Sequence, residues 1–178
     1  MVAQLSNAKF AAKYRFDTER IFLIGHSLGA WNALMTTAHA PSVRATAALA
    51  TFNVGYFAER LHHEAGFKDE LIKALEVLGT DPLHNTSPRQ LADEIEAHYE
   101  IWDPRSFTAQ LTTRPLYLVG AKHDIEAPKE PHHDAIVTWI KAAGHDHITD
   151  EVLDTDHGFG DMREALIAKL IAWLDGVE

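Results

Sequence analysis

The sequence predicts an α/β protein in which a mainly parallel sheet lies between two layers of helices. Short apolar runs alternate along the chain with longer stretches of helix-forming residues, the order that βαβ units produce. The run IFLIG at residues 21–25 has four large apolar side chains, which is typical of a strand that is buried on both faces. A tight turn and an Ala-rich segment that ends before Pro41 follow this run.

The other elements follow from composition and periodicity. Apolar residues at helical spacing near the C-terminus indicate an amphipathic helix, and Pro115 stands where the first residue of a strand tolerates proline. We expect helices over residues 3–14, 28–40, 131–143 and 161–175, and strands over residues 21–25, 43–53, 114–120 and 147–154.

Residues 55–113 carry no strand signal. Helical stretches around 57–78 and 88–100 are separated there by the breaker GTDP at 79–82. A structureless loop of this length would be unusual in a compact domain, so the segment is predicted to be a helical, cap-like insert. Residues 1–178 are therefore interpreted as a single domain that contains this insert.

Composition excludes several classes of function. A formal net charge of −10 disfavours nucleic acid and anionic membranes as partners. The absence of cysteine excludes disulfides, thiolate catalysis and cysteine-zinc sites. The first 16 residues lack the apolar core of a signal peptide, and no run approaches the roughly 18 apolar residues of a membrane span. We expect a cytoplasmic protein.

The segment GHSLG at residues 25–29 predicts a nucleophile turn. It matches G-x-S-x-G between a predicted strand and a predicted helix, whereas a glycine-rich connection without chemistry is the alternative. Ser27 would stand on a strained turn, where a Cβ at position 25 or 29 would collide with backbone. Leu28 N–H, at the helix N-terminus, is the predicted oxyanion donor. His26 is interpreted as a packed structural residue rather than a second base.

A serine hydroxyl needs a base, and the base needs an orienting carboxylate. Asp124 follows the third predicted strand, where Glu126 competes with it. His157 follows the fourth strand, at the carboxyl edge where ligand and catalytic groups of such sheets gather. His145 and His147 stand at the opposite end of that strand.

Histidine pairs raise the alternative of a metal site. The candidate ligands are His62-His63, His132-His133 and the run HDH at 145–147. Adjacent residues on a helix do not share a face, and no H-E-x-x-H spacing is present. These histidines are therefore predicted to be exposed polar residues.

The segments DTERIFLIGHSLGAWNALM and VLDTDHGFGDMREALIAKLIAWL resemble the α/β-hydrolase superfamily, and look most like its dienelactone hydrolase and prolyl-oligopeptidase-like branch. The resemblance implies a triad of Ser27, Asp124 and His157, with no metal and no organic cofactor. In the family several strands precede the nucleophile turn, whereas here it follows the first predicted strand. The chain thus resembles the C-terminal part of the fold, without the loop that supplies the second oxyanion donor.

This departure has two consequences. The strand from Ile21 to Ile24 would form an uncovered apolar edge, which predicts a homo-oligomer, a partner segment, or cover by residues 1–16. The N–H groups of residues 51–54, after the second strand, are candidate replacements for the missing oxyanion donor.

We expect a serine hydrolase that cleaves carboxylic esters, and secondarily small peptides or amides, through an acyl-enzyme on Ser27. The alternative is a truncated, catalytically incompetent half that acts as a binding or scaffold module or is a fragment of a longer protein. Acyl transfer is a third, minor hypothesis. Candidate pocket lining is aromatic: Trp31, Phe52, Tyr56, Phe57, Tyr99 and Trp102.

Overall fold

The structure is a computed structural model that describes residues 2–78, 83–144 and 147–177. The chain divides into two compact units. The first comprises Met1–Asn53 and Phe107–Glu178, and the second comprises Val54–Ser106. Within the described ranges, no helix is long and apolar enough to cross a membrane.

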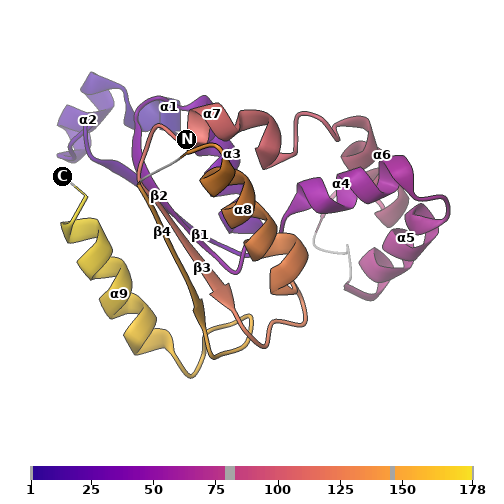
Figure 1. Ribbon diagram of the computed structural model, residues 1–178. Helices are drawn as coiled ribbons and strands as arrows, with labels where there is room; N and C mark the ends of the chain where they lie inside the picture. The colour runs from indigo at the N-terminus through magenta and orange to yellow at the C-terminus, as the bar shows by residue number, and fades with distance from the viewer. Residues whose placement is uncertain (1, 79–82, 145–146, 178) are drawn as a thin grey trace. The chain divides into compact units, whose positions relative to one another are not determined.

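A four-stranded parallel sheet forms the centre of the first unit (Figure 1). Every neighbouring pair of strands is parallel, so all four carboxyl ends lie at one edge of the sheet. The spatial order follows the chain order: β1 (Ile21–His26), β2 (Val43–Leu49), β3 (Leu116–Ala121) and β4 (Ile148–Leu153). The predicted parallel sheet is confirmed.

Helices cover both faces of this sheet. Successive side chains of a strand point to opposite faces, so Leu116 and Leu118 face one layer while Tyr117 and Val119 face the other. The first face packs against α3 (Leu28–His39), α7 (Thr108–Leu111) and α8 (Ala135–Ala142), and the second packs against α9 (Arg163–Asp175).

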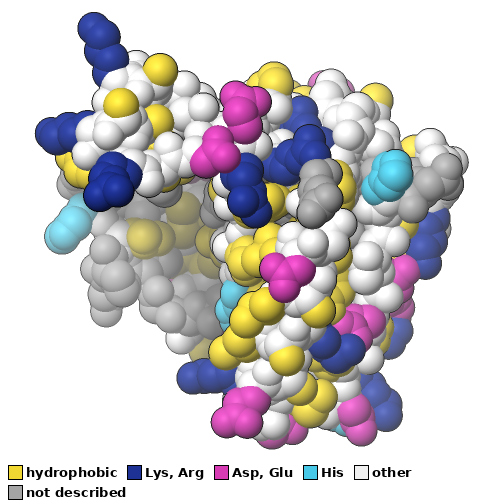
Figure 2. Space-filling view, turned by 90° about the vertical axis from the view of Figure 1, so that its left-hand side faces the viewer, with side chains coloured by type: hydrophobic (Ala, Val, Ile, Leu, Met, Phe, Trp, Pro, Cys, Tyr) yellow, Lys and Arg dark blue, Asp and Glu magenta, His cyan; other side chains and the backbone are white. Residues whose placement is uncertain are grey.

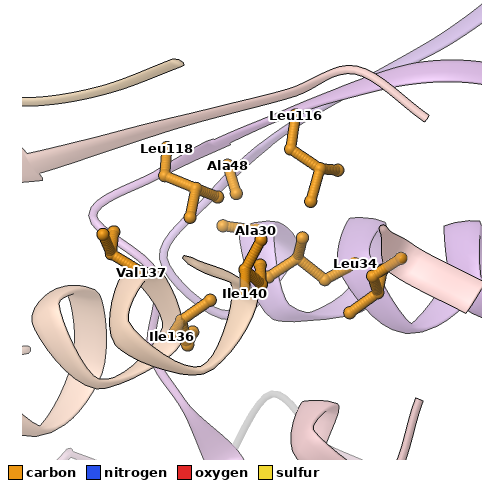
Figure 3. Close-up of a cluster of buried hydrophobic side chains, with 9 residues drawn as sticks. Ala30, Leu34, Ala48, Leu116, Leu118, Ile136, Val137 and Ile140 are labelled. Carbon is orange, nitrogen blue, oxygen red and sulfur yellow. The ribbon is translucent and has the colours of Figure 1, made fainter. Parts of the chain in front are cut away.

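Figure 3 shows the first of these contacts, in which strand residues point toward the helices. Ala30 and Leu34 of α3 are fully buried there, and Ile136 and Ile140 of α8 are almost fully buried. On the second face, Leu166 of α9 contributes to the buried cluster. The three-layer arrangement predicted from the sequence is therefore present.

The prediction of one helix over residues 3–14 is wrong. The segment forms α1 (Val2–Leu5) and α2 (Ala8–Tyr14), with Asn7 between them. The Asn7 side chain accepts hydrogen bonds from the backbone N–H groups of Lys9 and Phe10 and so starts a new helix. Arg15, at φ 58°, ends it.

Two further predicted elements differ in detail from the structure. Strand β2 ends at Leu49 instead of continuing to residue 53, since Ala50 adopts a φ of 42°. The predicted helix over 131–143 begins as a π-helical turn, η2 (Glu130–Asp134), before it continues as α8.

Strand β1 is an edge strand, hydrogen-bonded only to β2 among the described strands. Its side chains are not buried on both faces as the apolar run suggests: Ile21 is buried, Phe22 and Leu23 are half-buried, and Ile24 is 51% exposed. A strand with a single neighbour has less surface covered than a central strand with two.

The described residues of the second unit form helices α4 (Val54–His63), α5 (Phe67–Leu78) and α6 (Pro88–Ala97), followed by the start of η1 (Pro104–Phe107). The helix predicted over 57–78 is interrupted near Gly66, whose φ is 91°. The predicted breaker at 79–82 lies outside the described residues. The insert is predicted to reach residue 113, whereas Leu111 of α7 packs in the core of the first unit.

Candidate active site

Ser27 stands on the turn between β1 and α3, with φ 57° and ψ −125°. A non-glycine residue in this conformation is strained, and such strain concentrates at functional sites. Gly25 makes the turn possible, because a Cβ there would lie 2.1 Å from the carbonyl oxygen of Gly29. The collision predicted for a Cβ at Gly29 is wrong: position 29 is already in the first turn of α3, and a Cβ there meets no described atom within 4 Å.

Backbone hydrogen bonds hold this turn against strand β2. The N–H of Ser27 donates to the carbonyl of Leu49 at 2.9 Å, and the N–H of Phe52 donates to the carbonyl of Ser27 at 3.1 Å. The Ser27 hydroxyl makes no capping hydrogen bond to α3. Leu28 opens the helix, where N–H groups have no intrahelical acceptor and the dipole favours negative charge. The side chain and the neighbouring donor are thus both available for chemistry.

Asp124 and His157 form the central contact of the site. Oδ2 of Asp124 lies 2.7 Å from Nδ1 of His157, and both residues are only 8% exposed. The other carboxylate oxygen accepts from the N–H groups of Glu126 and Ala127 at 2.9 and 2.7 Å. Because the carboxylate can only accept, the histidine proton sits on Nδ1 and leaves Nε2 free to accept another proton.

The competitor Glu126 takes a different place. Its carboxylate lies 3.9 Å from Nε2 of His157, on the other side of the ring, and the side chain is 69% exposed. Between the two acids, the structure thus brings Asp124 to the orienting nitrogen and leaves Glu126 in solvent.

The residue before the serine links the nucleophile turn to the loop that carries His157. Nε2 of His26 lies 2.7 Å from the carbonyl oxygen of His157, and the two rings are 4.8 Å apart. Within the described residues, the Ser27 hydroxyl has no hydrogen bond to His157 Nε2. Serine–histidine bonds in free enzymes are often long and shorten when substrate binds. Much of the surface of His26 is exposed to solvent, although its ring contacts the rings of His157 and Phe159.

The sequence interpretation missed two buried histidines beside the site. His132 is 2% exposed and His133 is 5% exposed, so their prediction as exposed residues is wrong. They lie in η2, which leads into α8, whose inner face packs on the sheet. Gly120 makes room for His133, because a Cβ on Gly120 would lie 2.9 Å from its ring. The apolar residues that follow the pair, together with this glycine, were the available signal.

Burial favours the neutral form of both rings. Desolvation lowers the pKa of His132 to about 4 and also lowers the pKa of His133. Nδ1 of His132 accepts the backbone N–H of Asn53 at 3.0 Å, and its ring stacks on Phe52 at 5.4 Å. His132 thereby fixes the loop after β2. Phe52 of this loop donates its N–H to the carbonyl of Ser27 and so fixes the nucleophile turn.

This bonding pattern corrects part of the prediction for a second oxyanion donor. The N–H of Phe52 is used by the carbonyl of Ser27, and the N–H of Asn53 is used by His132. Two of the four candidate N–H groups are therefore occupied, and Thr51 and Val54 remain predictions.

The other predicted residues are dispersed. His62 stacks on Tyr99 at 4.1 Å within the second unit, which also contains Tyr56, Phe57 and Trp102 of the aromatic set. In the described part of the chain, no group of three or more His, Asp or Glu side chains could hold a metal ion. His145 lies outside the described residues. The absence of a metal and the pocket-lining role of the aromatics stay predictions.

Comparison with solved structures assigns the fold. The chain is similar to a 2,6-dihydroxy-pseudo-oxynicotine hydrolase (TM-score 0.60, 22% identity, 99% of this chain and 44% of that chain). It is also similar to an esterase from Pyrococcus furiosus (0.61, 15%, 95% and 58%) and to an acylaminoacyl peptidase from Pyrococcus horikoshii (0.57, 17%, 85% and 22%). No protein-family model and no curated protein sequence matches the chain.

The chain has the α/β-hydrolase fold, as the resemblance predicted. It spans less than two thirds of the length of each of these three structures. At such identities the likeness shows the fold alone, and assignment to the dienelactone hydrolase and prolyl-oligopeptidase-like branch stays a prediction.

Proposed function

We propose that the protein is a serine hydrolase that cleaves carboxylic esters, and secondarily small peptides or amides, through an acyl-enzyme on Ser27. The observation that carries this proposal is the pair Asp124–His157, buried and 2.7 Å apart, at the same sheet edge as a serine on a strained turn. Hydrolysis through an acyl-enzyme requires this combination of nucleophile, base and orienting acid.

In the proposed first step, Ser27 Oγ attacks the ester carbonyl carbon while its proton passes to Nε2 of His157. Asp124 holds Nδ1–H and stabilises the imidazolium that forms. The N–H of Leu28 donates to the developing oxyanion. The carbon–oxygen bond of the ester then breaks, and the leaving alkoxide takes the proton from Nε2.

In the second step, water attacks the acyl-enzyme and gives a proton to Nε2. The bond between the acyl carbon and Ser27 breaks, and the proton returns to the serine. Absence of a second oxyanion donor would lower the rate by about 100- to 1,000-fold. We therefore expect slow hydrolysis unless Thr51 or Val54 supplies that donor. An alcohol or amine in place of water would give the minor alternative, acyl transfer.

Labelling with a fluorophosphonate, followed by intact-mass measurement, tests the proposal without a guess about substrate. Wild type is expected to gain one adduct, and Ser27→Ala none. Hydrolysis of p-nitrophenyl butyrate should disappear in the same variant. Equal background hydrolysis by wild type and Ser27→Ala would refute the proposal.

The short coverage of the similar structures supports a second candidate, a catalytically incompetent half that acts as a binding or scaffold module or is a fragment of a longer protein. This candidate predicts a folded protein whose Ser27 does not react with the fluorophosphonate. An in-frame hydrolase segment in the DNA upstream of Met1 would support it further.

Self-association, or pairing with a partner segment through the strand from Ile21 to Ile24, is part of the proposal. It is supported by the position of β1 at the edge of the sheet and by the 51% exposure of Ile24. Sedimentation at micromolar concentration tests it, and a monodisperse monomer would contradict self-association. The substrate is proposed to be a small ester, and a cytoplasmic location stays a prediction.

A further inference from the structure

One hydrogen bond of the site spans the width of the sheet. Strands β1 and β4 are the outer strands in the order β1-β2-β3-β4, so at about 4.8 Å per strand they lie about 14 Å apart. The His157 loop follows β4, whereas Ser27 follows β1. The loop must therefore extend past the carboxyl ends of β3 and β2 before its histidine can approach the serine.

The other hydrogen bonds of this loop hold it on its own side. Backbone N–H groups of Lys122 and His123, after β3, donate to the carbonyls of Leu153 and Thr155 at 2.9 and 3.0 Å. The N–H of Gly158 donates to the Asp156 side chain within the loop at 3.0 Å. Asp124, also after β3, holds the imidazole. Each of these contacts relates the loop to β3, β4 or itself.

His26 makes the contact that reaches the nucleophile turn. Its Nε2 lies 2.7 Å from the carbonyl oxygen of His157, and its ring also meets Phe159 edge-on at 6.1 Å. A carbonyl oxygen only accepts hydrogen bonds, so Nε2 of His26 carries the proton. His26 directly precedes Ser27 in the chain, and the bond therefore links the backbone of the histidine to the nucleophile turn.

We infer that His26 is a positioning residue that sets the distance between Ser27 and His157. Asp124 fixes the rotation and the protonated nitrogen of the imidazole, while His26 fixes where the backbone that carries this imidazole lies. The inference rests on the proposed function, since it concerns the reactivity of the same serine. A shift of about 1 Å between reacting groups can lower a rate by about 100-fold. Loss of this one hydrogen bond is therefore expected to lower the rate at which Ser27 reacts.

The reach of the side chain provides the test. In His26→Gln the amide nitrogen extends about as far as Nε2 and can donate to the same carbonyl. In His26→Asn the amide nitrogen is too close to the backbone, and His26→Ala has no donor. His39→Ala is a matched control, because Nδ1 of His39 also bonds a carbonyl, that of Met35 at 2.7 Å, at the other end of α3.

The rate of fluorophosphonate labelling of Ser27 is measured for wild type and the four variants, with kcat and KM for p-nitrophenyl butyrate and the thermal midpoint. We expect His26→Ala and His26→Asn to lower labelling and kcat by about 10- to 100-fold, with KM changed by no more than about twofold. His26→Gln is expected to recover labelling to within about threefold of wild type, and His39→Ala to label like wild type.

Equal labelling of wild type and His26→Ala would overturn this inference while leaving the proposed function intact. An unlabelled wild type would overturn the proposed function and the inference together. If His26→Ala does not fold, the comparison of His26→Gln with His26→Asn decides, and equal labelling of these two variants would overturn the inference.

Discussion

The two ends of the parallel sheet differ in backbone strain and in buried ionisable groups. At the carboxyl end, Ser27 adopts φ 57° and ψ −125°, and Ala50 directly after β2 has a φ of 42°. Before β1, Arg15 also has a positive φ, but its φ of 58° and ψ of 47° are those of an ordinary left-handed helix cap. The buried pair Asp124–His157 lies at the carboxyl end. Strained backbone and buried ionisable groups are costly, and both gather where function requires them.

The amino end has a large cavity but less of this chemistry. The cavity measures about 740 Å³, and among the residues that line it are Ser42, Arg44, Thr113, Arg114 and Trp173. Arg114 Nη1 donates to the carbonyls of Thr37 and Ala40 at the end of α3, which is a structural role typical of a basic residue near a helix C-terminus. Strain and buried charge, rather than cavity size, therefore locate the candidate site. Figure 2 shows a face on which hydrophobic and charged side chains are interspersed.

The largest change, in the rate at which a fluorophosphonate labels Ser27, is expected from Asp124→Asn. The asparagine Oδ1 can keep accepting from the N–H groups of Glu126 and Ala127, while its amide nitrogen then faces Nδ1 of His157. That arrangement forces the proton onto Nε2, so the histidine cannot accept the serine proton. Labelling of Ser27 should fall by about a thousandfold or more.

Glu126→Gln is the matched control for this change. The Glu126 side chain is largely exposed, so its replacement should alter labelling by no more than about threefold. A larger loss in Glu126→Gln than in Asp124→Asn would reverse the assignment of the orienting acid.

The next effect concerns the stability of the carboxyl end at low pH. The pKa of His132 is about 4 in the folded chain, below its usual 6.5, so folding favours the neutral ring. Protonation of this histidine therefore leaves the free energy of unfolding unchanged above pH 6.5. As the pH falls toward 4 it lowers that free energy by up to about 3 kcal/mol. Urea unfolding at pH 7 and pH 4.5 measures it.

His132→Asn sharpens this measurement. Its amide oxygen can still accept the N–H of Asn53, but the side chain at position 132 no longer titrates. The free energy of unfolding of the variant should depend less on pH than that of wild type. The same decrease in both proteins would show that other groups cause it.

Two glycines of the nucleophile turn are expected to differ in their tolerance of a methyl group. Gly25→Ala places Cβ 2.1 Å from the carbonyl oxygen of Gly29 and should lower the free energy of unfolding by about 2 kcal/mol or more. In Gly29→Ala the methyl group meets open space on a helix, where the change should stay within about 1 kcal/mol. Thermal and urea unfolding of both variants check the contrast, and equal losses would contradict the close approach of Gly25 to Gly29.

The smallest effect is expected at the amino end. Arg44 lines the large cavity and is exposed, so Arg44→Ala should leave the labelling rate of Ser27 within about twofold of wild type. A strong loss of labelling in this variant would break the contrast between the two ends of the sheet.

Local patterns were sufficient for much of the fold. The order of strands and helices, the turn at residues 25–29 and the positions of Asp124 and His157 after β3 and β4 were readable because each depends on a few neighbouring residues. Some errors were local, such as the helix over residues 3–14, which the Asn7 cap divides. Others arose where a contact distant in sequence decides the outcome. His132 and His133 have the composition of exposed polar residues, and they are buried because α8 packs on the sheet and Gly120 leaves room for a ring.

The fold class, the strained turn at Ser27 and the candidate set of acid and base could all be derived from the chain alone, since glycine spacing and strand order carry that information. The choice between Asp124 and Glu126, and the contact of His26 with His157, required the folded arrangement. The physical reason is distance along the chain: 131 residues separate His26 from His157, and their hydrogen bond exists only once four strands have paired in order.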